Sequence, residues 1–153
     1  MTEIKLTSDE LQMISLFQNV SSATARDCII DEKMDRLIFV VEKGQMGLAI
    51  GKSGSTIKTL QSVMGKKVEL VEYSEDPAEF IKNALGSHYI QDVKINETAS
   101  GNKVAVVVVE PSKKGIVVGR EGRNAERARM LARRYFDISN VLIVSPEQIR
   151  SEE

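Results

Sequence analysis

Two short glycine turns, set 68 residues apart, constrain the fold of this chain more than any other feature of its sequence. The first spans residues 51–54 (Gly-Lys-Ser-Gly) and the second spans residues 119–122 (Gly-Arg-Glu-Gly). Each turn follows a glycine and three apolar residues, and each opens a stretch with helical spacing of its apolar residues. The apolar segments 37–41 and 105–109 fall in the same register upstream of the two turns. The sequence therefore predicts an internal duplication, with one glycine turn at the start of a helix in each copy.

The spacing of apolar residues predicts the same order of elements in both copies. The first copy is expected to contain a helix from a capping box of Thr7 and Glu10 to about Val20, strands over 25–30, 37–41 and 67–73, a short helical turn over 45–50, and a helix over 53–64. The second is expected to contain a helix from Pro77 to Leu85, with Asp76 as its cap and Glu79 completing a box, strands over 90–96, 103–109 and 140–144, and a helix over 122–136. This alternation predicts an α+β fold with helices on one face of a three-stranded sheet in each copy. The linker at 74–77 divides the chain into domains 1–74 and 75–153.

Several side chains are expected to be structural rather than chemical. Phe39, Phe80 and Cys28 are expected to be buried. The last helix is expected to turn one face inward, formed by Ala125, Ala128, Ala132 and Tyr135. The chain has no Trp, and its few Phe and Tyr residues fall mainly on apolar helix faces or strands, so aromatic stacking of bases is not expected.

Positive charge is concentrated at the two glycine turns, although the net charge of the chain is −1. Residues 43–67 carry five basic residues and no acidic one, and residues 113–134 carry eight basic and two acidic residues. The rest of the chain therefore has a net charge of −12. Such a distribution directs a polyanion toward the turns and away from other surfaces.

The turns have the chemistry of a site for a sugar-phosphate backbone. Glycine permits positive φ and close approach of another backbone, and a helix start presents N–H groups where the helix dipole is positive. Lys52 and Arg120 occupy the same place in the two copies and can donate charge-assisted hydrogen bonds to phosphate. A shallow apolar groove for unstacked bases is expected beside each turn, lined by Ile50 and Ile57 in the first copy and by Val118 and Ala125 in the second.

The first turn and the apolar residues before it resemble the KH module, whose GxxG loop clamps the backbone of single-stranded RNA. The helix ahead of the first two strands makes the order similar to the prokaryotic, type II KH fold. Residues 43–54, 65–74, 80–85 and 118–124 resemble, more narrowly, archaeal members of the NusA family. The likeness extends from about Leu6 to Val144.

This resemblance implies a non-catalytic transcription elongation or termination factor that binds nascent single-stranded RNA. Bacterial relatives also carry a polymerase-binding domain and an OB-fold domain, for which we expect no room in 153 residues. Among the properties that the resemblance implies, contact with RNA polymerase therefore has the weakest basis. The residues expected to bind RNA are Ile50, Gly51, Lys52, Ser53, Gly54, Ile57, Lys58, Val118, Gly119, Arg120, Glu121, Gly122, Arg123 and Arg127. Glu121 places a negative charge on the expected phosphate path, so we expect the second loop to bind RNA more weakly than the first.

Two other functions remain open at this point. One is a KH protein of ribosomal or RNA-processing complexes. The other is an interaction module that docks on polymerase through the acidic first helix and the acidic tail 147–153. RNA binding should weaken steeply with salt and compete with single-stranded RNA, whereas protein docking should not. We expect a monomer in either case.

The sequence indicates no enzyme, metal site or cofactor. The spacing from Gly47 to Gly51 is one residue short of a nucleotide-binding P-loop. One histidine, His88, and one cysteine, Cys28, lie 60 residues apart and offer no metal-ligand spacing. We expect no signal peptide, because residues 1–5 lack an apolar core, and the longest apolar run, 104–109, is too short to span a bilayer. With a single cysteine, these features favour the cytoplasm.

Overall fold

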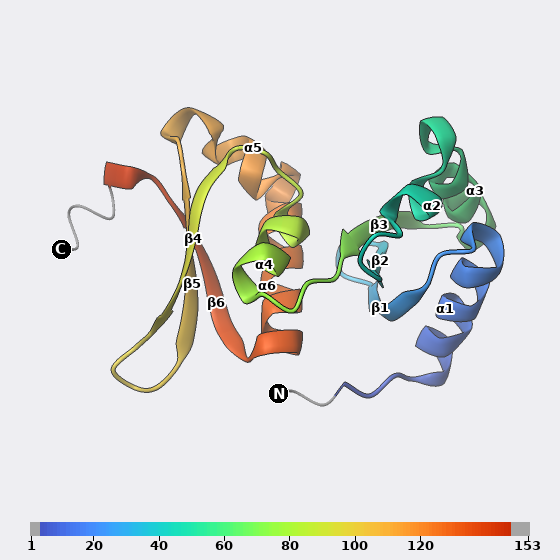
Figure 1. Cartoon of the computed structure of the whole chain (residues 1–153), viewed down its shortest axis with the longest axis horizontal. Coiled ribbons are helices and arrows are strands. Elements are labelled where there is room, and N and C mark those ends of the chain that lie inside the picture. Colours follow the sequence, from blue (N-terminus) through green and yellow to red (C-terminus); the bar gives the residue numbers. More distant parts are fainter. Residues whose placement is uncertain (1–3, 148–153) are drawn as a thin grey trace. The chain divides into compact units, whose positions relative to one another are not determined.

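The computed structural model describes residues 4–147, and its contacts divide the chain into two compact units (Figure 1). The first unit contains Lys5–Tyr73 and the second contains the described residues from Ser74 onward. Residues 148–153, which form most of the acidic tail considered for docking, lie outside the described residues.

The first unit has the predicted order of elements, and its boundaries follow local capping signals. Its elements are α1 (Ser8–Ser21), β1 (Ala25–Asp31), β2 (Arg36–Val41), α2 (Met46–Ile50), the 3-10 turn η1 (Lys52–Gly54), α3 (Ser55–Met64) and β3 (Lys67–Glu72). The capping box of α1 is confirmed, because the Thr7 hydroxyl accepts from the Glu10 amide and the Glu10 carboxylate accepts from the Thr7 amide. Gly65 ends α3 in the left-handed conformation at φ 67°.

The second unit repeats this order. Its elements are α4 (Pro77–Leu85), β4 (Ile90–Glu97), β5 (Lys103–Val109), the turn η2 (Pro111–Lys113), α5 (Lys114–Val118), the turn η3 (Arg120–Gly122), α6 (Arg123–Phe136) and β6 (Ile138–Val144). The strand expected from residue 140 begins at Ile138, because Asp137 ends α6 in the left-handed conformation and the chain extends directly afterwards.

One expected capping interaction of α4 is wrong. Asp76 caps the helix by accepting from the Ala78 amide, as predicted. Glu79, however, does not complete a capping box with Asp76. Its carboxylate accepts from the Ser74 hydroxyl at 2.9 Å, and Ser74 in turn accepts from the Asp76 amide. Ser74 therefore takes the place that the box would have given to Glu79.

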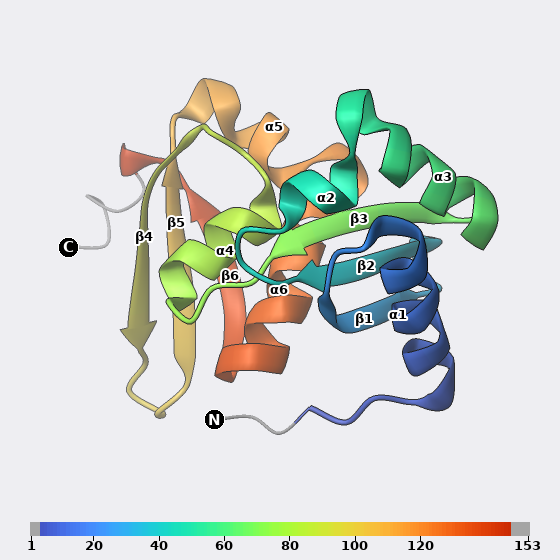
Figure 2. The same ribbon diagram turned by 45° about the vertical axis from the view of Figure 1, so that its right-hand side comes forward.

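Each unit has a three-stranded sheet with helices on one face, as the sequence predicts (Figures 1 and 2). The strand orders are β1-β2-β3 and β4-β5-β6. In each sheet the first pair of strands is antiparallel and the second pair is parallel. The parallel pair requires a crossover, and this crossover carries the glycine turn. The fold thus places each GxxG segment between two helices on one side of its sheet.

Apolar contacts between helices and sheet form the two cores. In the first unit Phe17 of α1 stacks on Phe39 of β2, with 4.6 Å between ring centroids. In the second unit Phe80 of α4 meets the rings of Tyr135 and Phe136 edge-on, at 5.1 and 5.8 Å. Cys28, Phe39 and Phe80 are all fully buried, which confirms their expected structural role.

A buried arginine joins all three strands of the first sheet. The Arg36 guanidinium donates to Asp31 at 2.8 Å and to Glu69 at 3.0 Å, and its side chain is fully buried. Two carboxylates compensate the buried cation, as such a charge requires. The network aligns strands β1, β2 and β3 at the end of the sheet where β2 begins.

Candidate nucleic-acid interface

The two GxxG loops have nearly the same backbone conformation. Gly51 and Gly119 have φ of 75° and 86°, with ψ of 171° and 166°. The third residue of each loop, Ser53 or Glu121, lies in the left-handed region, as does the second glycine, Gly54 or Gly122. The duplication inferred from sequence is therefore also a duplication of loop geometry.

The first glycine of each loop is required for steric reasons as well as for its dihedral angles. A β-carbon at Gly51 would meet the Thr56 hydroxyl and would lie 2.7 Å from the Thr56 amide nitrogen. A β-carbon at Gly119 would lie 2.7 Å from Cγ of Asn124. Thr56 and Asn124 occupy equivalent positions in the duplication, so the first turn of the following helix packs directly beneath each loop. The sequence interpretation missed both residues, although their common position in the repeat is a signal that marks them.

The glycine amides of both loops are used inside the turn. The Gly51 amide donates to the Gly47 carbonyl at 2.9 Å, and the Gly54 amide donates to the Gly51 carbonyl at 3.1 Å. The second loop repeats both bonds, with the Gly119 and Gly122 amides as donors. These bonds give each loop a defined shape. The glycine amides that form them are not available to a ligand, so each loop offers fewer main-chain donors than the sequence predicted.

The first loop carries two exposed cations and no acid. Lys52 lies within the loop and Lys58 lies one turn into α3, and both are exposed. The Lys58 side chain runs beside the loop, since its Cε would be 4.0 Å from a β-carbon built at Gly54. Two ammonium groups thus flank one turn that has no carboxylate within residues 51–59.

The second loop has a mixed charge. Arg120 and Glu121 are both exposed at adjacent positions of the turn. The position that matches Lys58 is Glu126, whose carboxylate lies 3.9 Å from Arg129. Arg123 opens α6 and is half-buried, with one terminal nitrogen out of contact with solvent. The side chains of this loop therefore carry both signs of charge, whereas the first loop carries positive charge alone.

Arg127 has a different position from the one expected for a phosphate ligand. Its Nε donates to the Ala84 carbonyl at 2.6 Å and its Nη2 donates to the Leu85 carbonyl at 3.5 Å, so the guanidinium caps the C-terminus of α4. Nη2 also donates to Asn124 Oδ1 at 3.1 Å. The side-chain nitrogen of Asn124, Nδ2, donates to the Ile116 carbonyl at 3.5 Å. Arg127 therefore connects α4 to the residue beneath the second loop.

Exposed apolar side chains precede both loops. Leu48 and Ile116, three residues before the first glycine of each loop, are 53% and 54% exposed. The predicted groove residue Ile50 is also exposed, whereas Val118 and Ile57 are half-buried and Ile57 packs against the first core. Ala125 is buried and cannot line a groove; it belongs to the inward face of α6, where the sequence also placed it. The sequence interpretation missed Leu48 and Ile116, although the repeat aligns them.

Neither a candidate metal cluster nor a candidate membrane-spanning helix occurs among the described residues. No cluster of three or more His, Cys, Asp or Glu side chains suited to a metal ion occurs among residues 4–147. Over the same residues, none of the helices combines the length and the apolar character needed to cross a membrane. Among the aromatic residues, Tyr89 is 45% exposed.

Comparisons with protein-family models match both halves of the chain. Residues 12–75 match the KH domain, and residues 77–145 match the NusA-like second KH domain. The crystal structure of APE1850 superposes with a TM-score of 0.82 at 38% sequence identity, covering 91% of this chain and 100% of that one. The type II order of elements, the two GxxG loops and these matches agree.

Two curated relatives that align with nearly the whole chain share one name. A protein of Halococcus morrhuae named "Probable transcription termination protein NusA" is 38% identical over 90% of this chain and 96% of its own length. A protein of Methanocaldococcus jannaschii with the same name is 31% identical over 97% of this chain and 79% of its own length. This chain therefore belongs to the NusA family and consists of two tandem KH domains.

Proposed function

We propose that this protein is a transcription elongation and termination factor that binds nascent single-stranded RNA through its two GxxG loops. The observation that supports this function most directly is the repetition of one loop geometry beside exposed cations and exposed apolar side chains. A chance arrangement would not preserve both the left-handed third residue and the exposed apolar residue at equivalent positions.

The contacts at the first loop follow from its geometry. The RNA backbone passes over the turn, where Lys52 and Lys58 donate to phosphate oxygens. The amides of Lys52 and Ser53 are the main-chain donors that meet the phosphate, since the glycine amides are used within the turn. Bases unstacked from the strand lie against Leu48 and Ile50, two exposed residues of α2 that precede the loop in the chain.

The second loop extends the binding surface with lower affinity. Arg120 is its exposed cation, and the neighbouring Glu121 opposes phosphate. Arg123 contributes through the part of its guanidinium that remains accessible. Two sites of unequal strength on one chain bind a single RNA more tightly than either site alone, because the second contact becomes intramolecular.

The wider role follows the relatives named for transcription termination. In this proposal the protein acts as a monomer in the cytoplasm, without catalysis, and meets RNA near RNA polymerase. Docking on polymerase through the acidic residues Asp9 and Glu10 is a second, compatible function, because both acids lie in the first turn of α1, where Asp9 is exposed and Glu10 is half-buried.

Binding of a short fluorescent single-stranded RNA, measured by anisotropy over a range of salt concentrations, tests the proposal. We expect Lys52→Asp to weaken binding and to lower the slope of log affinity against log salt by about 0.7 for each lost phosphate contact. Lys33→Asp, the same charge change at an exposed position of the β1–β2 turn, is the matched control. Equal effects of the two substitutions, or binding that does not respond to salt, would contradict a phosphate site at the first loop.

A further inference from the structure

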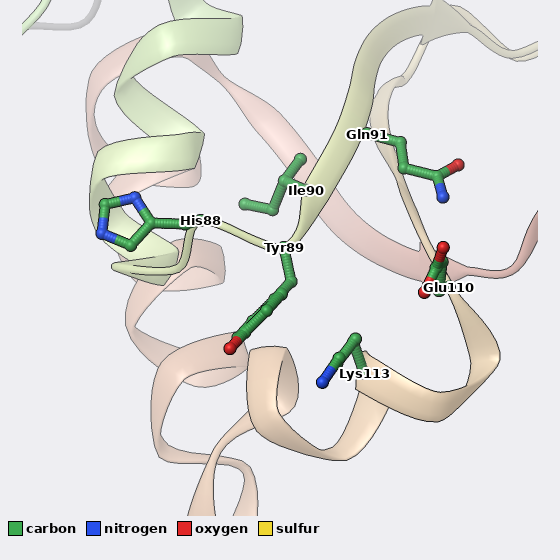
Figure 3. Close-up of a pocket in the computed structure, with 6 residues that line it drawn as sticks. All are labelled: His88, Tyr89, Ile90, Gln91, Glu110 and Lys113. Atoms are coloured by element: carbon green, nitrogen blue, oxygen red, sulfur yellow. The ribbon is translucent and has the colours of Figure 1, made fainter.

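A pocket of about 330 Å³ lies in the second domain, outside both GxxG loops (Figure 3). Its walls come from the segment that enters β4 and from the turn that follows β5, and the residues that line it are His88, Tyr89, Ile90, Gln91, Glu110 and Lys113. The volume is at the lower end of the range for small-ligand pockets, about 300–1,000 Å³.

The side chains of this pocket have complementary chemistry. The Tyr89 ring is half-exposed, and the Lys113 ammonium lies 4.7 Å from its centroid. Figure 3 shows these two side chains close together, with Gln91 and Glu110 next to each other across the pocket. The Tyr89 amide donates to the Ser87 hydroxyl at 3.2 Å, which holds the backbone at the base of the ring. An aromatic face, an ammonium, a carboxylate and an amide thus meet in one opening.

At the matching place in the first domain, the side chains form contacts that the second domain lacks. Strand pairing defines the match, because Ala25 pairs with Val41 as Ile90 pairs with Val109, and a register shift follows in both. On this basis Tyr89, Gln91, Glu110 and Lys113 correspond to Thr24, Arg26, Glu42 and Gln45. In the first domain the Thr24 amide donates to Gln45 at 2.6 Å, and Arg26 pairs with Glu42 at 2.6 Å.

The substitutions in the second domain remove both of these contacts. Gln91 in place of Arg26 cannot form the ion pair, and Lys113 in place of Gln45 turns to the aromatic ring instead of the backbone. Within residues 4–147, Glu110 forms no ion pair. The side-chain contacts at this place therefore differ between two otherwise similar domains, and in the second domain the Glu110 carboxylate lines the pocket.

We propose that this pocket holds a guanine base of the bound RNA, an inference that rests on the RNA binding proposed above. The base stacks on Tyr89, as unstacked bases do on exposed aromatic rings. Guanine carries two adjacent N–H donors and a carbonyl oxygen on one edge. The Glu110 carboxylate accepts from the two donors, and Lys113 or the Gln91 amide donates to the carbonyl oxygen.

The other three bases fit this set of groups less well. Adenine and cytosine each offer one amino group beside a ring nitrogen that repels a carboxylate, and uracil offers one N–H between two carbonyl oxygens.

The position of the pocket also suits an RNA already held at the second loop. Helix α5, five residues long, lies between Lys113 and the loop and rises about 7.5 Å at 1.5 Å per residue.

Anisotropy titrations of the full chain test this assignment with oligouridine and with versions carrying guanosine, adenosine or cytidine at regular positions. We expect the guanosine RNA to bind about five- to tenfold more tightly than the others. Glu110→Gln should remove this preference, and any change that it makes in oligouridine affinity should equal the change made by Glu97→Gln. Tyr89→Phe should keep the preference and Tyr89→Ala should lose it, and Glu97→Gln, at the far end of the β4–β5 hairpin, is the control for Glu110.

The outcomes separate this inference from the proposed function. Oligouridine binding that depends on Lys52, without any guanosine preference, overturns the pocket assignment alone. Failure of the wild-type chain to bind any of these RNAs overturns the proposed function and the pocket assignment together. Guanosine monophosphate that binds the wild type but not Glu110→Gln, without a preference among the RNAs, assigns the pocket to a free nucleotide and overturns its role in RNA binding.

Discussion

Ser53 and Glu121 occupy the same left-handed backbone position in the two loops, with φ of 54° and 58°. Neither residue is glycine, so both loops hold a conformation that side chains rarely adopt. The residue at this position is exposed in both domains. Its side chain therefore alters the charge of the loop without altering the core, which makes the pair a natural point of comparison between the two KH domains.

Removing the charge of Glu121 should strengthen RNA binding. Glu121→Asn deletes the carboxylate and introduces a residue that tolerates the left-handed region well, so the loop should keep its shape. We expect RNA affinity to rise about two- to fivefold at low salt, with a smaller gain at high salt. Glu97→Asn removes one negative charge from an exposed position of the same domain and is the control. An equal gain from both changes would show an effect of net charge rather than of the loop.

Reversing the loop cation should be more harmful in the first domain than in the second. Lys52→Asp and Arg120→Asp are matched changes at equivalent exposed positions, and neither disturbs a loop glycine. The first loop has Lys58 beside it, whereas the second has Glu121 and Glu126, so we expect the larger share of affinity at the first loop. Filter binding of both variants at one salt concentration gives the comparison. A greater loss for Arg120→Asp would reverse this ranking.

Arg127 should contribute to stability rather than to phosphate binding. Arg127→Met removes the donors that cap α4 and contact Asn124, and we expect the free energy of unfolding to fall by about 1.5–3 kcal/mol. The salt dependence of RNA binding by the folded variant should not change, because no phosphate contact is lost. Denaturant unfolding and salt titration measure the two effects separately. A lower salt slope with unchanged stability would restore the expected role of Arg127 as a phosphate ligand.

The first loop glycine should be intolerant of any side chain. Gly51→Ala forces a β-carbon against Thr56 and into a positive φ, so we expect a loss of at least about 1–3 kcal/mol in the free energy of unfolding. Gly47→Ala, four residues earlier within α2, meets no atom within 4 Å and should be neutral or stabilising by up to about 1 kcal/mol. Chemical denaturation of both variants checks the contrast. Similar stabilities would contradict the steric role of Gly51.

Features that depend on contacts between residues close in the chain were predictable from the sequence. The box of Thr7 and Glu10 and the glycine that ends α3 depend on contacts within a few residues. The spacing of apolar residues likewise predicted the strands and the buried Phe39 and Phe80. Because the duplication repeats these local signals, it also located both loops of the candidate site.

Side chains that act across the fold were not predictable in the same way. Arg127 was expected to bind phosphate, and no role was expected for Arg36. Strand pairing places Arg36 between Asp31 and Glu69, and the packing of α6 against α4 brings Arg127 to the Ala84 carbonyl. Tyr89 is the opposite case, an aromatic ring that remains half-exposed.

The amino-acid sequence by itself determined the two KH domains, their element order and the backbone of their GxxG loops, because glycine dihedrals, capping and periodicity are local properties of the chain. Only the tertiary structure decided which cations remain free to meet phosphate and where a pocket opens. Those outcomes depend on the partner that the packed elements bring to each side chain, and residues such as Ala84 and Arg127 are 43 positions apart before folding joins them.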